Sequence, residues 1–121
     1  MLVNNAALYG EIDLSDNSAD YLRHVYDVNV IGQWLMARAF APTMVRKGRG
    51  RVLNVSSLAS LCPEPPGSLY APAKAFMTTA SRALRFDLLG TGVHCTALCP
   101  GFTYTEFHDV LGNRAEMNKL P

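Results

Sequence analysis

The sequence has 121 residues, which is enough for about one domain built around a single hydrophobic core. Apolar residues make up 49% of it and charged residues 17%, a balance that excludes a disordered chain, a collagen and a coiled coil. Eleven basic residues against ten acidic ones give a net charge of +1, so we expect no nucleic-acid partner and no anionic membrane surface.

The first part of the chain predicts one strand followed by a long helical region. Residues 1–5 begin with aliphatic side chains and read as a short buried strand. Apolar side chains then recur every three or four residues over residues 18–47, which predicts one or two helices. Gly32 and Pro42 lie inside this region, and we expect them to bend or divide it.

The second part of the chain repeats the pattern of strand and helix. Residues 51–55 and 93–98 are rich in β-branched or aliphatic side chains and predict two more buried strands. Between them, residues 68–89 have helical spacing and are followed by Gly90-Thr91-Gly92. A glycine after the last periodic position is typical of a helix end.

Strand, helix, strand, helix, strand is the order typical of an α/β fold whose parallel strands are joined by right-handed crossovers. In such a sheet ligands bind outside the carboxyl ends of the strands. Small, polar or glycine residues end or follow all three expected strands: Asn4-Asn5-Ala6-Ala7, Asn54-Val55-Ser56-Ser57 and Cys99-Pro100-Gly101-Phe102-Thr103. The sequence therefore predicts a ligand site at this edge of the sheet.

Tyr70, Lys74 and Ser57 could carry acid–base chemistry. Tyr70 and Lys74 are four residues apart at the start of a predicted helix, so their side chains share one face. A phenol has a reference pKa of about 10, and a neighbouring ammonium favours its phenolate. Ser57 could polarise a carbonyl oxygen near that phenol, with Ser56 turned away because side chains alternate along a strand. The alternatives are a solvated Tyr–Lys pair and a serine that caps a turn.

Five features, in this order, resemble the short-chain dehydrogenase/reductase family: N-N-A-A at residues 4–7, Asn29, Ser57, Y-A-P-A-K at residues 70–74, and Pro100-Gly101. In that family a strand ends in N-N-A-G, a helix carries a catalytic asparagine, a serine precedes Y-x-x-x-K, and a P-G turn follows the next strand. The resemblance covers nearly the whole chain. It implies a partial Rossmann-type, doubly wound parallel sheet with flanking helices, as a single partial domain over residues 1–121.

The resemblance implies hydride transfer between NAD or NADP and a small-molecule carbonyl or alcohol substrate. Tyr70 would be the general acid/base, Ser57 would orient the substrate oxygen, and Lys74 would hold the cofactor ribose and lower the tyrosine pKa. Asn29 would fix a water of the proton relay, or would simply bond a carbonyl freed at a helix bend. The residues implied in cofactor binding are Asn4, Ala6, Tyr70, Lys74, Pro100, Gly101, Thr103 and Thr105.

Several positions depart from the family's pattern without removing a reacting group: Ala7, Ser60, Pro72 and Ala73. The larger departure is that the family's N-terminal T-G-x-x-x-G-x-G turn, which binds the cofactor pyrophosphate, has no counterpart in the sequence. We therefore expect further strand and helix units to be encoded upstream, and weak cofactor binding by the 121-residue chain alone. The alternative is a truncated, non-catalytic fragment or dimerisation piece.

The remaining motifs are ordinary structural features. Trp34, Phe40 and Met44 form an apolar stripe typical of a core or a subunit interface, and the resemblance favours an interface in a homo-oligomer. The sequence has no G-x-S-x-G motif, so we expect no catalytic triad from its three histidines.

The three cysteines, Cys62, Cys95 and Cys99, predict reduced thiols rather than disulfides, because their number is odd and no secretory leader is recognisable. A cytoplasmic location is the expectation. Cys95 and Cys99 lack a second pair of cysteines or histidines at metal-ligand spacing, so no metal site is expected. No apolar run approaches the roughly 20 residues that span a bilayer.

Overall fold

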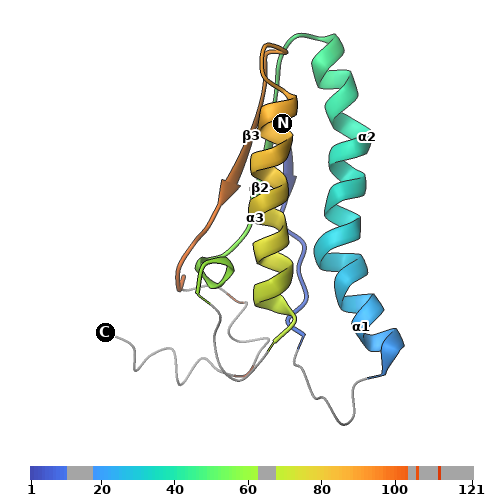
Figure 1. The fold of residues 1–121 in the computed structure, drawn as a ribbon, viewed down its shortest axis with the longest axis vertical. Helices are drawn as coiled ribbons and strands as arrows, with labels where there is room; N and C mark the ends of the chain where they lie inside the picture. The colour runs from blue at the N-terminus through green and yellow to red at the C-terminus, as the bar shows by residue number, and fades with distance from the viewer. Residues whose placement is uncertain (11–17, 63–67, 104–105, 107–111, 113–121) are drawn as a thin grey trace.

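The computed structural model describes residues 1–10, 18–62, 68–103, 106 and 112 (Figure 1). In chain order its elements are β1 (Leu2–Asn4), α1 (Ala19–Tyr26), the π-helix η1 (Asp27–Gly32), α2 (Gln33–Arg46), β2 (Gly50–Val55), the short 3₁₀ helix η2 (Leu58–Ser60), α3 (Tyr70–Asp87) and β3 (Val93–Leu98). The predicted alternation of strands and helices is confirmed.

The three strands form one parallel sheet in the order β1-β2-β3. Leu2 pairs with Val52, and Val52 in turn pairs with Cys95. Because all three strands run in the same direction, their carboxyl ends lie at one edge of the sheet, as the sequence predicts. The helices α2 and α3 both pack on the strands, and Figure 1 shows them side by side on one face of the sheet.

The hydrophobic core lies between the sheet and these two helices. Side chains along β1 and in the first part of β3 alternate between buried and exposed, as expected for strands with one covered face. Each fully buried aliphatic side chain stabilises the fold by about 1.5–3 kcal/mol. One cluster of this core consists of Leu2, Val52, Leu88, Val93 and Cys95, with Met44 and Leu84 packed against it.

The long helical region begins with a side-chain cap and contains a π-helical turn. The Ser18 hydroxyl accepts a hydrogen bond from the Tyr21 N–H at 3.1 Å, which satisfies one free donor at the start of α1. The π-helix η1 separates α1 from α2 and ends at Gly32, where the sequence predicts a break. Pro42 lies inside α2 and does not divide it. Its position is exposed, so water can reach the carbonyl that loses its backbone donor.

The turn from α3 to β3 requires glycine. Gly90 and Gly92 have φ angles of 77° and 76°, in the left-handed region that side chains disfavour. At Gly92 an added Cβ would lie 2.0 Å from the backbone oxygen of Gly48, so the two turns are in close backbone contact. This packing explains the glycine stop predicted after the helix.

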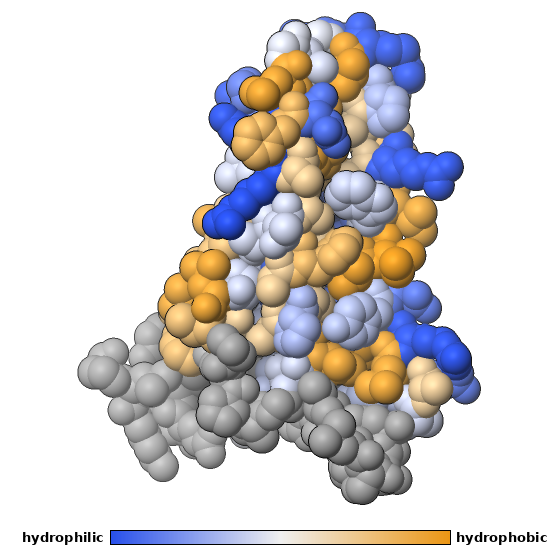
Figure 2. All heavy atoms as spheres, viewed as in Figure 1, coloured by the Kyte–Doolittle hydropathy of each residue, from blue (hydrophilic) through white to orange (hydrophobic). Residues whose placement is uncertain are grey.

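Several large apolar side chains remain on the surface. Trp34 and Phe40 are exposed on α2, so a core position for these two residues is wrong, whereas Met44 is half-buried against the core. Figure 2 shows apolar side chains gathered over α2 and the adjoining part of α3. Among the described residues, no helix has both the length and the apolar character needed to cross a membrane.

Candidate active site

A buried row of polar side chains connects the ends of β1 and β2 to α3. The Asn4 Nδ2 donates to the Asn54 Oδ1 at 2.8 Å and to the Gln33 carbonyl at 3.2 Å. The Asn54 Nδ2 donates in turn to the Ser81 Oγ at 2.8 Å. Asn4, a predicted cofactor residue, is buried, and its side-chain nitrogen serves to join the strand ends.

Ser56 and Ser57 have the opposite orientations predicted from strand alternation. Ser56 is buried; its hydroxyl donates to the Lys74 carbonyl at 2.8 Å and lies 2.7 Å from the Thr78 Oγ1. Ser57 is half-buried and caps η2, with its Oγ accepting from the Ala59 N–H at 3.1 Å. That bond uses the oxygen as an acceptor, so the Ser57 hydroxyl can still donate its proton to a substrate oxygen.

Lys74 is a buried cation placed between the end of β2 and Tyr70. Its side chain is on the face of α3 that packs on the sheet, and the residue is only 2% exposed. The Nζ donates to the Val55 carbonyl at 2.7 Å and lies 5.4 Å from the centre of the Tyr70 ring. Burial lowers the pKa of Lys74 from 10.5 to about 8. This arrangement keeps a positive charge beside the phenol, as the four-residue spacing predicts.

Asn29 occupies the π-helix and is fully buried. Its Oδ1 accepts from the Leu8 N–H at 2.7 Å, and its Nδ2 donates to the Leu8 carbonyl at 2.7 Å. The side chain therefore bonds to a distant segment rather than to a carbonyl freed within its own helix. π-Helical turns are frequent at functional sites, and this one directs a side-chain amide at the segment after β1.

The turn after β3 is joined to η2. The Pro100 carbonyl accepts from the Leu58 N–H at 2.8 Å, which brings this turn next to Ser57. Gly101 and Thr103 are exposed, and the Thr103 hydroxyl donates to the Gly101 carbonyl at 3.1 Å. Thr105, the predicted carboxamide contact, lies outside the described residues.

Two polar side chains near the end of β1 are absent from the sequence-based site. Gln33 is buried, and its Nε2 donates to the carbonyl of Ala6 at 2.6 Å, while its Oε1 has no hydrogen-bond partner in the described part of the chain. Tyr9 lies with its ring centre 5.7 Å from that of Tyr70. Tyr9 follows the N-N-A-A strand end by two residues, which is the one sequence signal that points to it.

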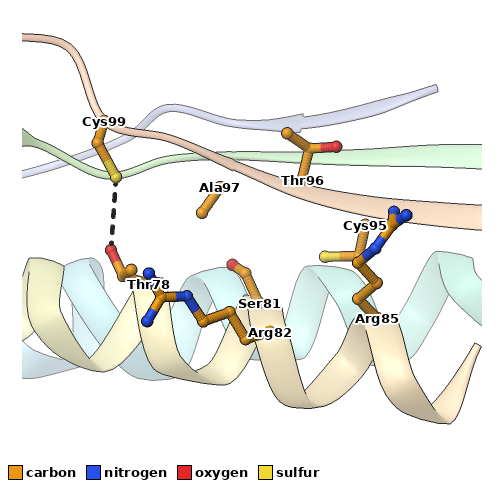
Figure 3. Close-up of a pocket in the computed structure, with 8 residues that line it drawn as sticks. All are labelled: Thr78, Ser81, Arg82, Arg85, Cys95, Thr96, Ala97 and Cys99. Atoms are coloured by element: carbon orange, nitrogen blue, oxygen red, sulfur yellow. Dashed lines mark hydrogen bonds between the residues drawn. The ribbon is translucent and has the colours of Figure 1, made fainter.

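A separate pocket of about 320 Å³ lies between α3 and β3 (Figure 3). The thiols of Cys95 and Cys99 and the guanidinium groups of Arg82 and Arg85 are among its lining groups. Burial raises the pKa of the Cys95 thiol. None of the described lining residues is a predicted site residue, so this pocket is distinct from the cluster around Tyr70. Within the described ranges, no three His, Cys, Asp or Glu side chains are grouped to hold a metal ion.

The grouped residues can perform proton transfer next to a bound oxygen. A phenol flanked by a buried ammonium can exchange a proton. The Ser57 hydroxyl retains its proton and can donate it to a ligand at the end of β2. The Lys74 ammonium has three donors, and among the described residues only the Val55 carbonyl accepts from it. The other two suit a ligand that carries neighbouring hydroxyl groups.

Known proteins share this sequence and this fold. The sequence profile of the short chain dehydrogenase family matches residues 1–116. The chain is 39% identical over 112 residues to a sulfoacetaldehyde reductase from Chromohalobacter salexigens, covering 88% of this chain and 43% of that protein. It is 34% identical over 108 residues to the 2-(R)-hydroxypropyl-CoM dehydrogenase of Xanthobacter autotrophicus, covering 87% of this chain and 43% of that one.

A solved structure agrees with these matches. A short-chain dehydrogenase from Sphingobium yanoikuyae, in complex with NADPH, superimposes with a TM-score of 0.86 at 29% identity, over 99% of this chain and 46% of that chain. The chain therefore spans less than half the length of the relatives it matches.

Proposed function

The chain belongs to the short-chain dehydrogenase/reductase family, and from this premise we propose that its protein is an NAD(P)-dependent oxidoreductase acting on a small carbonyl or alcohol compound. The observation that carries the proposal is the buried Lys74 ammonium, bonded to Val55 at 2.7 Å and 5.4 Å from the Tyr70 ring centre. Burying a cation lowers the stability of the fold. The position of Lys74 beside the proposed acid/base gives a functional reason for a lysine at this buried site.

A nicotinamide cofactor fits the side chains at this edge of the sheet. Lys74 has two donors left for the hydroxyls of a ribose, and the Gln33 Oε1 is a buried acceptor without a partner among the described residues. Asn4, Ala6, Pro100, Gly101, Thr103 and Thr105 are proposed to contribute further contacts. The cofactor, when bound, supplies or accepts the hydride.

The chain's own residues move and direct the proton. In reduction, the Tyr70 hydroxyl donates its proton to the substrate oxygen; in oxidation, the tyrosinate takes the proton from the alcohol. The Ser57 hydroxyl donates a hydrogen bond to the same oxygen and orients it. Lys74 holds a positive charge beside Tyr70, which stabilises the tyrosinate form. Asn29 fixes the segment after β1 through Leu8, and we propose that it also orders a water for the proton relay.

Site-directed variants of the whole protein test this assignment. Tyr70→Phe should lower turnover by roughly 10²- to 10⁴-fold, because it removes the proton donor, while leaving the cofactor dissociation constant nearly unchanged. Lys74→Ala should both lower turnover and weaken cofactor binding. Turnover is followed by the absorbance of the reduced nicotinamide, and binding by calorimetry.

Tyr21→Phe is the control for this experiment, because Tyr21 lies on the exposed face of α1. It should match the parent in both measurements. A Tyr70→Phe protein as active as its parent would remove Tyr70 from the chemistry and with it the proposed mechanism.

We further propose that the protein is a homo-oligomer whose copies meet on the apolar surface of α2 and α3. Leu35 and Phe40 on α2 and Phe76 on α3 are exposed, although burial of such side chains is favourable. Light scattering of Leu35→Glu should report a smaller particle than the parent. Phe86→Glu, at the end of α3 and also exposed, is the control and should leave the particle size unchanged.

The free cysteines among the described residues favour a reducing compartment, and we propose the cytoplasm.

A further inference from the structure

The segment of residues 8–10 is fixed by backbone hydrogen bonds on both sides of Tyr9. On one side, the Asn29 side chain bonds both the N–H and the carbonyl of Leu8, each at 2.7 Å. On the other side, the Gly10 carbonyl accepts from the Leu69 N–H at 2.7 Å. Leu69 immediately precedes Tyr70, so the second bond connects this segment directly to the start of α3.

Gly10 allows this close approach. It is buried, and a Cβ at its position would lie 2.9 Å from the Val25 Cγ1 and 3.4 Å from the Leu69 Cβ. A larger residue would push the segment away from α1 and from α3. The backbone on either side of Tyr9 is therefore held against both the long helical region and the helix that carries Tyr70.

The Tyr9 ring packs against the ring of the proposed acid/base. The two ring centres are 5.7 Å apart with an angle of 37° between the ring planes, which is within the range of favourable aromatic pairs. Tyr9 is nevertheless 37% exposed, so part of its surface is not covered by the described chain. Tyr9 therefore has a fixed backbone, packs on the Tyr70 ring and offers an uncovered aromatic surface beside that ring.

From these contacts we infer that Tyr9 is a specificity-determining residue, whose exposed ring surface forms one wall of the substrate site and favours substrates with a flat, apolar group beside the reacting carbon. The inference rests on the proposed function, because it takes Tyr70 as the acid/base. It adds a substrate class to that function: aryl or conjugated carbonyl compounds over saturated ones of the same size.

The experiment compares two ketones of similar size on the whole protein, methyl phenyl ketone and methyl cyclohexyl ketone. The quantity measured is the ratio of their kcat/KM values. Tyr9→Leu should lower this ratio by about 2- to 10-fold, the usual worth of an aromatic pair, because the variant removes the flat surface. Tyr9→Phe retains the ring and should keep the parent's ratio. Tyr21→Leu is the matched control, since Tyr21 is also 37% exposed but lies on α1.

A binding measurement separates this inference from the proposed function. The alcohols corresponding to the two ketones are titrated into the parent and the variants by NMR, which requires no turnover. A parent that binds neither nicotinamide cofactor by calorimetry would count against the proposed function, whereas the inference about Tyr9 would still be tested by the binding preference between the two alcohols. An unchanged ratio in Tyr9→Leu, in turnover or in binding, would overturn the inference. Tyr9→Met gives the same test if the leucine variant does not fold.

Discussion

Replacing Lys74 by methionine removes a buried positive charge while nearly keeping the side-chain volume. The residue is 2% exposed, and its Nζ donates to the Val55 carbonyl. Burial lowers its pKa from 10.5 to about 8. A buried ammonium is costly, and the size of this cost can be measured because it depends on pH.

The direction of the pH effect follows from the lowered pKa. Between about pH 8 and 10.5 the unfolded chain binds more protons at Lys74 than the folded chain, so the parent becomes more stable as the pH rises through this window. The change in pKa corresponds to about 3 kcal/mol, most of which is gained between pH 7 and pH 10. The variant has no group that titrates at this position, so it gains none of this stability.

Urea unfolding followed by circular dichroism, at pH 7 and at pH 10, measures the effect. The free energy of unfolding of the parent minus that of Lys74→Met should rise by about 2–3 kcal/mol between the two pH values. Lys47→Met, at the exposed C-terminal end of α2, controls for the removal of one positive charge. A difference between parent and Lys74→Met that stays constant with pH would show that Lys74 is not buried as a cation.

Three further predictions concern folding and thiol chemistry. Asn29→Ala should lower the free energy of unfolding by about 2–4 kcal/mol, because it leaves the backbone N–H and carbonyl of Leu8 without their side-chain partner. Urea unfolding measures this loss, and a value below about 0.5 kcal/mol would contradict the prediction. Gly92→Ala should destabilise the protein far more than Gly90→Ala in thermal unfolding. Both positions need a left-handed conformation, but only at Gly92 would the added Cβ also clash with the backbone of Gly48. Similar losses for the two variants would count against the contact between Gly92 and Gly48. Iodoacetamide at neutral pH should label Cys62 before Cys95, whose pKa burial raises, as peptide mass spectrometry can show; early labelling of Cys95 would refute its burial.

Local patterns in the sequence were sufficient for the strands and for the two serines. β-Branched and aliphatic runs locate β2 and β3 within a residue of their observed bounds. Alternation along a strand predicts that Ser56 and Ser57 point in opposite directions, because the direction of each side chain depends only on the local backbone. The pairing of Tyr70 with Lys74 is equally local, since residues four apart on a helix are neighbours.

Contacts between distant segments could not be predicted in the same way. Asn29, in the π-helix, bonds Leu8, which is 21 residues away in the sequence. The bond from Gln33 to Ala6 and the packing of Tyr9 on Tyr70 likewise join segments far apart in the chain. Gln33 lies in no recognisable motif, and Tyr9 is indicated only by its place after the N-N-A-A strand end. Their contacts with the site form only when the helices pack on the sheet, so the sequence alone does not indicate them.

The amide pair between Asn4 and Asn54 has a consequence for how the strands find their register. A slip of β1 by two residues along β2 would keep the same side chains on the covered face, so hydrophobic burial alone discriminates poorly against it. In the observed register the two asparagines are directly opposite each other. After such a slip, Asn4 would face Val52 or Ser56, and the buried Asn54 oxygen would lose its donor. The polar pair thus raises the free energy of a misaligned register that apolar packing alone would tolerate.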